Sequence, residues 1–328
     1  MGIVLFILGT SVTVFTVVDL IWTTLWIDGG AGPISKRIAR VTWMMTKKIS
    51  KNRKGLFNIV GPLILVFTLL SWVLLLWLGL TVLFSSDPNS IVKTTFDGPV
   101  MWYERVYFTG FSLFTLGIGD YSPQPGLWQI ITAINSGMGI LLLTLGASYT
   151  ISVISAVVKK RAVARTITGL GENSTEIIQK AWNGEDFYQL DLFLMNVSSQ
   201  ITELTQQHQA YPLLHYYHSQ KPDESSAVGI AILDDLLTIL YYGVDDKSTV
   251  NMPLLIEARS SIGTYLETMT SAFIKQAETV PPAPTLSNLK GESVPLVSED
   301  TFSKQIDSIS QRRKQLLGAV QADNHEWP

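Results

Sequence analysis

The sequence has no cysteine, so disulfides and thiolate metal sites are excluded, and the redox compartment cannot be inferred. Charge is also scarce: 16% of the 328 residues are charged, whereas 47% are hydrophobic. The hydrophobic residues are crowded into the first half, and we expect no membrane-spanning run from Lys159 onward. Crossing the hydrocarbon core takes about 20 mostly apolar residues in a helix. This uneven distribution predicts an all-α membrane protein with a soluble helical tail.

Three stretches are long and apolar enough to be transmembrane helices. They run from Ile3 to Ile27, from Ile59 to Phe84 and from Leu127 to Val158. A signal peptide is disfavoured because no basic residue precedes the first stretch, whose apolar run exceeds the roughly 7 to 15 residues of a signal core. Asp19 lies inside this stretch, where a carboxylate is costly. We therefore expect it to pair with a neighbouring chain or to reach the interface.

The net charge of −3 hides two opposed halves. Residues up to Arg161 include 13 Lys or Arg against 6 Asp or Glu, and the remainder includes 11 against 21. The loop from Ser35 to Lys54 is basic without any acid, and the third stretch ends in Lys159-Lys160-Arg161. Because such basic segments stay in the cytoplasm, we predict an outside N-terminus and a cytoplasmic C-terminal domain at the plasma membrane. The acidic tail gives no reason to expect nucleic acid as a partner.

Apolar residues recur at helical spacing within the basic loop. They are Ile38, Val41, Met44, Met45 and Ile49. The segment is predicted either to lie flat on the inner leaflet, with its lysines near lipid phosphates, or to be a solvated loop. The pattern alone does not decide between these alternatives.

A short glycine-containing motif, Thr115-Leu116-Gly117-Ile118-Gly119-Asp120, lies between the second and third stretches. A selective cation pore needs oxygen ligands that replace the ion's hydration shell, and rings of backbone carbonyls supply them. Glycine adopts the required backbone angles at little steric cost. The aromatic segment from Trp102 to Phe114 predicts a short re-entrant helix whose C-terminal end faces the pore and favours a cation. We therefore predict a selectivity filter that binds K⁺ through Thr115, Leu116, Gly117, Ile118 and Gly119, with Asp120 at its mouth.

The segment from Phe108 to Pro123 resembles the pore loop of the potassium channel superfamily, particularly bacterial channels with two core transmembrane helices and one pore loop per subunit. The resemblance covers residues 59–160, under a third of the chain. The family pattern is Thr-Val-Gly-Tyr-Gly-Asp, so Leu116 and Ile118 depart from it. Replacing the tyrosine by Ile118 removes a hydroxyl and an aromatic cuff that brace the filter from behind. The resemblance implies a homotetramer in membrane lipid that conducts K⁺ and needs no cofactor.

The third stretch is interrupted by glycines, and Gly139 stands where the inner helix of the family has its hinge. Such a glycine is expected either to let the helix bend or to allow close helix packing. One helical face carries Ile140, Leu143, Thr144, Ala147 and Ile151, and the resemblance implies that this face and Gly139 line and gate the pore.

Beyond Arg161 the hydrophobic pattern predicts helices. They are expected from 174 to 182, 185 to 207, 224 to 242 and 253 to 278, followed by a polar linker from Pro281 and an amphipathic helix from Thr301 to Ala319. Phe302, Ile306, Ile309 and Leu316 are expected to face partner chains. His208, His215 and His218 are expected to be surface or packing residues, because no matching third ligand completes a metal site. Gly169-Leu170-Gly171 does not complete a dinucleotide fingerprint.

The predicted organisation has five parts: an outer transmembrane helix (1–27), a basic cytoplasmic loop (28–58), a pore domain (59–161), a helical cytoplasmic domain (162–280) and a linker with a C-terminal helix (281–328). The predicted function is potassium conduction, gated by an unknown ligand or protein partner of the cytoplasmic domain. Alternatives are a nonselective cation channel, a potassium transporter subunit and a membrane-anchored interaction protein. No nucleophile and base are paired in the sequence, so no enzymatic activity is expected.

Overall fold

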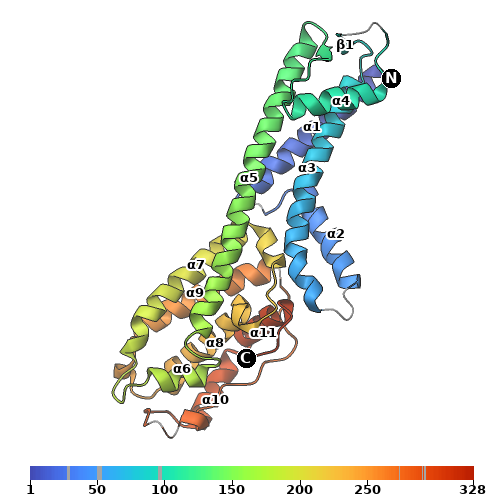
Figure 1. Ribbon diagram of the computed structural model, residues 1–328. Coiled ribbons are helices and arrows are strands. Elements are labelled where there is room, and N and C mark those ends of the chain that lie inside the picture. The colour runs from blue at the N-terminus through green and yellow to red at the C-terminus, as the bar shows by residue number, and fades with distance from the viewer. Residues whose placement is uncertain (28–29, 50–53, 95–97, 273, 290, 292) are drawn as a thin grey trace. The chain divides into compact units, whose positions relative to one another are not determined.

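The computed structural model describes residues 1–27, 30–49, 54–94, 98–272, 274–289, 291 and 293–328 (Figure 1). The chain divides into two compact units. The first comprises Met1–Lys51 and Pro62–Val153, and the second comprises Asn52–Gly61 and Ile154–Pro328. The boundary at 153 and 154 falls within one helix.

The first unit contains long apolar helices with a short helix across their ends (Figure 1). Its elements are α1 (Gly2–Leu25), α2 (Pro33–Ile49), α3 (Val60–Phe84), β1 (Ile91–Lys93), α4 (Trp102–Leu113), β2 (Tyr121–Pro123) and α5 (Leu127–Thr168). A 3₁₀ turn, Lys54–Ile59, leads into α3 and belongs to the second unit. The core forms around Trp72, Leu76, Leu80, Phe84 and Phe108.

Small residues bring α1 against α3. A Cβ atom added to Gly9 would lie 2.4 Å from the backbone nitrogen of Leu83, and one added to Gly79 would lie 2.6 Å from the hydroxyl of Thr13. Glycine at both positions therefore allows the two backbones to approach, as in many membrane helix pairs.

A two-stranded antiparallel ribbon departs from the all-helical expectation. β1 pairs with β2 in a register that places Ile91 opposite Pro123 and Lys93 opposite Tyr121. Strands of three residues carry too short an alternation to be recognised by periodicity. The ribbon joins the chain just after the filter motif to the loop after α3.

Four helical segments among the described residues are long and apolar enough to cross a membrane: Gly2–Leu25, Phe57–Phe84, Leu127–Thr168 and Ser226–Gly243. Our expectation of no such run beyond Lys159 was therefore wrong by length and composition. The fourth segment differs in burial, because 89% of its apolar window is buried against 28% to 39% for the others.

Helices pack around a buried central helix in the second unit. They are α6 (Ser174–Ala181), α7 (Asp191–Ala210), α8 (Ser226–Thr238), α9 (Met252–Ala272), α10 (Glu299–Ser308) and α11 (Ser310–Ala322), and a π-helical turn (Ile239–Gly243) extends α8. Every residue of α8 is buried, and it contacts α6, α9 and α11. Asp234 and Asp235 of α8 form ion pairs with Arg312 and Arg313 of α11. These pairs explain how two acids are tolerated in the unit's core.

Several predicted helices of this unit are confirmed. Asn173 caps α6, where its side chain accepts a hydrogen bond of 3.0 Å from the Glu176 backbone. The helix predicted from 185 to 207 is α7, which begins later, at Asp191, and buries Leu194, Val197, Ile201 and Leu204. The fourth predicted helix was too long, because α9 ends at Ala272.

The predicted last helix was wrong in two respects. The segment forms two helices that meet at Ile309 instead of one. Phe302, Ile306 and Leu316 are buried within their own chain and do not face partner chains, and Ile309 is half-buried. The amphipathic pattern identified a buried face but not the element that covers it.

Candidate ion-conduction site

The helix preceding the filter motif is held by both of its neighbours. α4 matches the predicted short helix and ends at Leu113. From α3, Trp77 donates a hydrogen bond of 2.9 Å to the carbonyl of Val106, and the hydroxyl of Thr81 lies 2.8 Å from that of Thr109. From α5, Ser136 donates a hydrogen bond of 2.8 Å to the carbonyl of Ser112. The C-terminal end of α4, the negative end of its dipole, is therefore fixed next to the filter motif.

The sign of φ alternates along the predicted filter. The φ angle is +57° at Thr115, +62° at Gly117 and +87° at Gly119, whereas Leu116 and Ile118 are not among the positive-φ residues. Positive φ is uncommon for a residue with a side chain, so Thr115 carries local strain. A Cβ atom added to Gly117 or Gly119 would meet no atom of the chain within 4 Å. Glycine is therefore required there by backbone conformation and not by packing.

The filter residues are exposed in the single chain. Leu116 is 65% exposed and Ile118 52% exposed, and Asp120 is half-buried. The backbone nitrogens of Thr115 and Leu116 donate hydrogen bonds to the carbonyls of Ser112 and Phe111 at the end of α4. Exposed non-helical backbone next to long apolar helices needs either a protein cover or a water-filled cavity.

The predicted pore-lining face of α5 adjoins the filter. A hollow of about 500 Å³ is lined by Thr115 together with Gly139, Ile140, Leu143, Ala147 and Ile151. Thr144 does not line it, and its hydroxyl donates to the carbonyl of Ile140. The sequence interpretation missed Leu69 and Val73 of α3, which complete the wall. Their apolar spacing gave no sign that they face a hollow instead of lipid.

Gly139 marks the closest approach of α5 to α4. A Cβ atom at this position would lie 1.8 Å from the carbonyl oxygen of Leu113. α5 continues as one helix through Gly139 to Thr168. This contact accounts for glycine through close packing, the second of the two roles expected for it.

Asp19 is fully buried and has its partners within its own chain. Its carboxylate accepts hydrogen bonds of 2.7 Å from both the Ile34 backbone and the Ser35 hydroxyl, and one of 2.8 Å from the Trp72 indole. The expectation that Asp19 pairs with a neighbouring chain or reaches the interface was wrong. Instead Asp19 caps the first turn of α2 and joins α1, α2 and α3.

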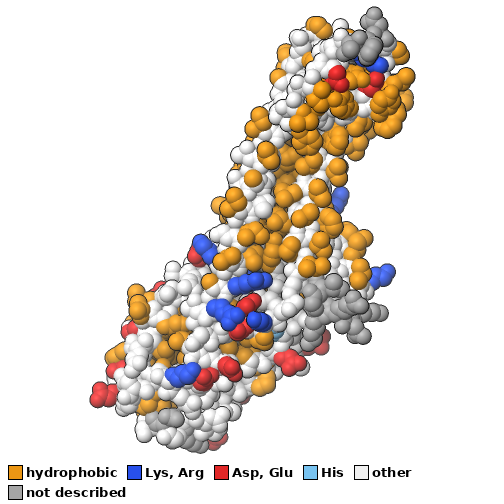
Figure 2. Space-filling model, in the orientation of Figure 1, with side chains coloured by type: hydrophobic (Ala, Val, Ile, Leu, Met, Phe, Trp, Pro, Cys, Tyr) orange, Lys and Arg blue, Asp and Glu red, His pale blue; other side chains and the backbone are white. Residues whose placement is uncertain are grey.

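α2 confirms that the basic loop contains a helix. Three small residues of this helix are buried: Ser35, Ala39 and Thr42. Two other groups are exposed. One is an apolar stripe of Val41, Met44, Met45 and Ile49, and the other is a basic set of Lys36, Arg37, Arg40, Lys47 and Lys48. Figure 2 shows extensive exposed hydrophobic surface on the first unit. Lys51 and Arg53 of the predicted loop lie outside the described residues. The two exposed stripes fit a helix at a membrane surface.

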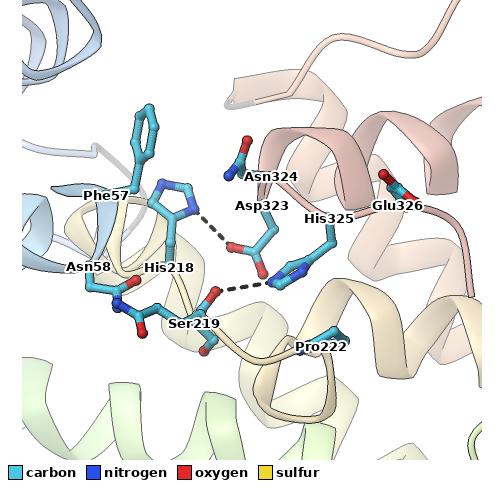
Figure 3. A pocket seen from close by; sticks show the side chains of 10 residues that line it. Phe57, Asn58, His218, Ser219, Pro222, Asp323, Asn324, His325 and Glu326 are labelled. Atoms are coloured by element: carbon cyan, nitrogen blue, oxygen red, sulfur yellow. Dashed lines mark hydrogen bonds and ion pairs between the residues drawn. The ribbon is translucent and has the colours of Figure 1, made fainter. Parts of the chain in front are cut away.

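The second unit holds a separate hollow of about 540 Å³ (Figure 3). In its wall, Nδ1 of His218 lies 2.8 Å from the Asp323 carboxylate, and Nε2 of His325 lies 3.0 Å from the Ser219 carbonyl. Burial opposes ionisation of Asp323, but Lys160 and the hydrogen bonds from His218 and Ser225 lower its pKa to about 2. This carboxylate therefore stays charged at neutral pH.

The other two predicted histidines are packing residues. Burial lowers the pKa of His208 and of His215 to about 3, so both are neutral at pH 7. His208 packs edge-on against Tyr265. Among the described residues, no group of three or more His, Cys, Asp or Glu side chains is arranged to hold a metal ion.

The chain is 43% identical over 311 residues to a protein of Bacillus subtilis (strain 168) described as "Uncharacterized membrane protein YdjJ". The aligned region covers 95% of this chain and 91% of that protein. No family model matches the chain, and no solved structure matches it. Together with its apolar helices, the likeness identifies the chain as a membrane protein.

Proposed function

The chain belongs to the family of the Bacillus subtilis membrane protein YdjJ, and we propose that it is one subunit of a potassium-selective channel. Four copies surround one axis, and the carbonyls of residues 115–119 form the rings that bind K⁺. The ion moves passively, and the helical second unit receives the gating stimulus.

The observation that carries this proposal is the alternating sign of φ along the predicted filter. Positive φ at Thr115, Gly117 and Gly119 alternates with Leu116 and Ile118. When residues of positive and non-positive φ alternate, successive peptide groups can turn the same way, and we infer that the carbonyls of residues 115–119 gather on one side of the chain. A strand whose carbonyls share one side and which follows the C-terminal end of α4 suits a dehydrated cation.

Two considerations support an assembly of several chains around one axis, and the number four comes from the resemblance to potassium channels. One filter strand cannot encircle an ion, and a closed ring of identical chains is the usual symmetry of an oligomer. The same assembly covers the exposed filter backbone and the apolar side chains of Leu116 and Ile118.

The proposed topology has three spans, namely α1, α3 and the first part of α5. α8 is assigned to the helical unit, because it is covered by other helices and carries Asp234 and Asp235 in ion pairs. The basic residues of α2 support a cytoplasmic position for the loop between the first two spans, and we assign the protein to the plasma membrane. This orientation puts the N-terminus and the β1–β2 ribbon outside.

The test is the reversal potential of purified protein in planar bilayers, with potassium on one side and sodium on the other. We compare the native chain with Gly117→Ala and with Gly184→Ala. Both glycines have positive φ and open space around an added Cβ, but Gly184 lies in a loop of the second unit. Alanine costs about 1–2 kcal/mol in the left-handed region of Gly117 and at least as much at Gly184, whose φ of +98° lies outside that region. Gly184→Ala is therefore a control for backbone strain outside the predicted filter.

We expect reversal near the potassium equilibrium potential in the native chain and in Gly184→Ala, and its loss in Gly117→Ala. Reversal near zero in the native chain would favour the nonselective cation pore, in which Ile118 fails to brace the filter. No current and no potassium binding by calorimetry would contradict the proposal and leave the interaction-protein alternative.

A further inference from the structure

The side chain of Ile118 has no group that can hydrogen-bond, yet the backbone just beyond it is bonded to Thr94. Thr94, directly after β1, donates through its hydroxyl to the carbonyl of Gly119 at 2.9 Å and through its backbone nitrogen to the carbonyl of Asp120 at 3.1 Å. The last filter peptide is therefore bonded to a strand 25 residues earlier. These bonds continue the β1–β2 register by one residue.

A second set of bonds ties this ribbon to α4. The Glu104 carboxylate accepts a hydrogen bond of 2.8 Å from the Tyr121 hydroxyl and lies 2.9 Å from the ammonium group of Lys93. Lys93 and Tyr121 are directly opposite each other in the ribbon. The Glu104 carboxylate therefore binds both strands at one pair of opposite residues, a contact that we call the clamp.

The Glu104 carboxylate is itself fixed. It is 8% exposed, and its second oxygen accepts a hydrogen bond of 2.7 Å from the Met101 backbone at the start of α4. That backbone bond and the bond from Lys93 lower the pKa of Glu104 to about 2. Burial and the bond to Glu104 raise the pKa of Tyr121 to about 12. The carboxylate is therefore charged and the phenol protonated at neutral pH, the states that these two hydrogen-bonding roles in the clamp require.

We propose that Lys93, Thr94, Glu104 and Tyr121 form a filter collar, a set of positioning residues that holds the outer end of the filter and maintains its ion selectivity. The collar supplies from the neighbouring ribbon the support that the Ile118 side chain cannot give. The proposed effect of the collar on ion selectivity rests on the proposed channel function, whereas its proposed effect on the rigidity of the filter backbone does not.

The test uses matched variants of the full chain. Thr94→Val keeps the shape of the side chain but removes the hydroxyl, and Thr94→Ser keeps the hydroxyl. Tyr121→Phe removes only the bond to Glu104 and leaves the aromatic ring, which lies 6.0 Å from that of Tyr107. These variants avoid removing the buried carboxylate, a change that could prevent folding.

Two readouts separate rigidity from conduction. Hydrogen exchange in peptides covering residues 111–124 should become about fivefold faster in Thr94→Val and in Tyr121→Phe, the factor expected from losing one hydrogen bond of ordinary strength. Bi-ionic reversal potentials should show a lower preference for potassium over sodium by a similar factor. Thr94→Ser should match the native chain in both measurements.

Each outcome decides between the proposals. A potassium-selective native chain whose Thr94→Val and Tyr121→Phe variants keep native exchange and native selectivity would overturn the collar. Faster exchange with unchanged selectivity would overturn its role in positioning the ion path. If the native chain passes no potassium but the variants exchange faster, the channel proposal is refuted. The collar then remains as a set of residues that stabilises the backbone of residues 115–119.

Discussion

Replacing Gly139 by alanine is the sharpest perturbation that the structure offers. The new Cβ atom would lie 1.8 Å from the carbonyl oxygen of Leu113, and contacts under 3.0 Å force a shift. The two backbones must therefore separate by at least 1.2 Å, the difference between these distances. Because the clashing atom belongs to the backbone of α4, no side-chain rotation relieves the contact. Such overpacking costs about 3 kcal/mol.

Gly137→Ala is the matched control for this prediction. It lies two residues earlier in the same helix, and its Cβ atom would meet no atom of the chain within 4 Å. Both substitutions gain about 1 kcal/mol of helix propensity, so their comparison isolates the clash. Gly139→Ala should therefore be less stable than Gly137→Ala by about 3 kcal/mol, or roughly 6 to 12 °C in melting temperature.

The assay is thermal unfolding of detergent-purified protein, followed by potassium flux into liposomes. We expect Gly139→Ala to melt earlier and to lose flux, because the shifted end of α4 carries the filter with it. Equal melting temperatures for the two variants would refute the packing explanation. Equal melting combined with altered opening would restore Gly139 as a hinge.

Two further predictions concern buried ionisable groups. Asp19→Asn replaces a carboxylate that only accepts hydrogen bonds, so it should lower the free energy of unfolding by about 1–3 kcal/mol. Trypsin should then cleave α2 faster in a limited digestion, and an unchanged rate of cleavage would contradict the capping role of Asp19. Burial lowers the pKa of His208 and of His215 from 6.5 to about 3, so the unfolded chain binds more protons than the folded chain below pH 6.5. The free energy of unfolding should therefore fall by about 1.4 kcal/mol per pH unit per histidine from pH 6.5 down to pH 3, and should not change through these groups above pH 6.5. The melting temperature measured from pH 7.5 to 5 tests this, and His208→Gln should halve the slope; an unaltered slope would show that His208 does not titrate in this way.

The features predicted well from the sequence are those with local causes. α4 and the third stretch were recognised because an apolar run or an aromatic segment of sufficient length is itself the physical requirement for the helix. The special backbone angles of Gly117 and Gly119 were expected because positive φ is a property of one residue. The helix from 174 to 182 was predicted because capping is local: the Asn173 side chain bonds to a backbone nitrogen only three residues away.

The features missed depend on residues far apart in the chain. Asp19 is hydrogen-bonded to Trp72, 53 residues later in the sequence, and Tyr121 to Glu104, 17 residues earlier. Neither pairing produces a pattern in the local sequence. The location of α8 also depends on residues far away in the sequence. Its composition satisfies the length and hydropathy of a membrane span, and only the arginines of α11, 78 positions later, account for its acids within a protein core. The break at Ile309 was hidden because the apolar spacing continues through it.

The hydrogen bond between Trp72 and Asp19 joins two residues that are synthesised at different times. Asp19 leaves the ribosome 53 residues before Trp72, which corresponds to a delay of roughly 3 to 11 s at ordinary rates of synthesis. During this interval the nascent α1 carries a carboxylate that has Ile34 and Ser35 within early reach but still lacks its third partner. The set of hydrogen bonds around Asp19 is therefore complete only after Trp72 of α3 has been synthesised.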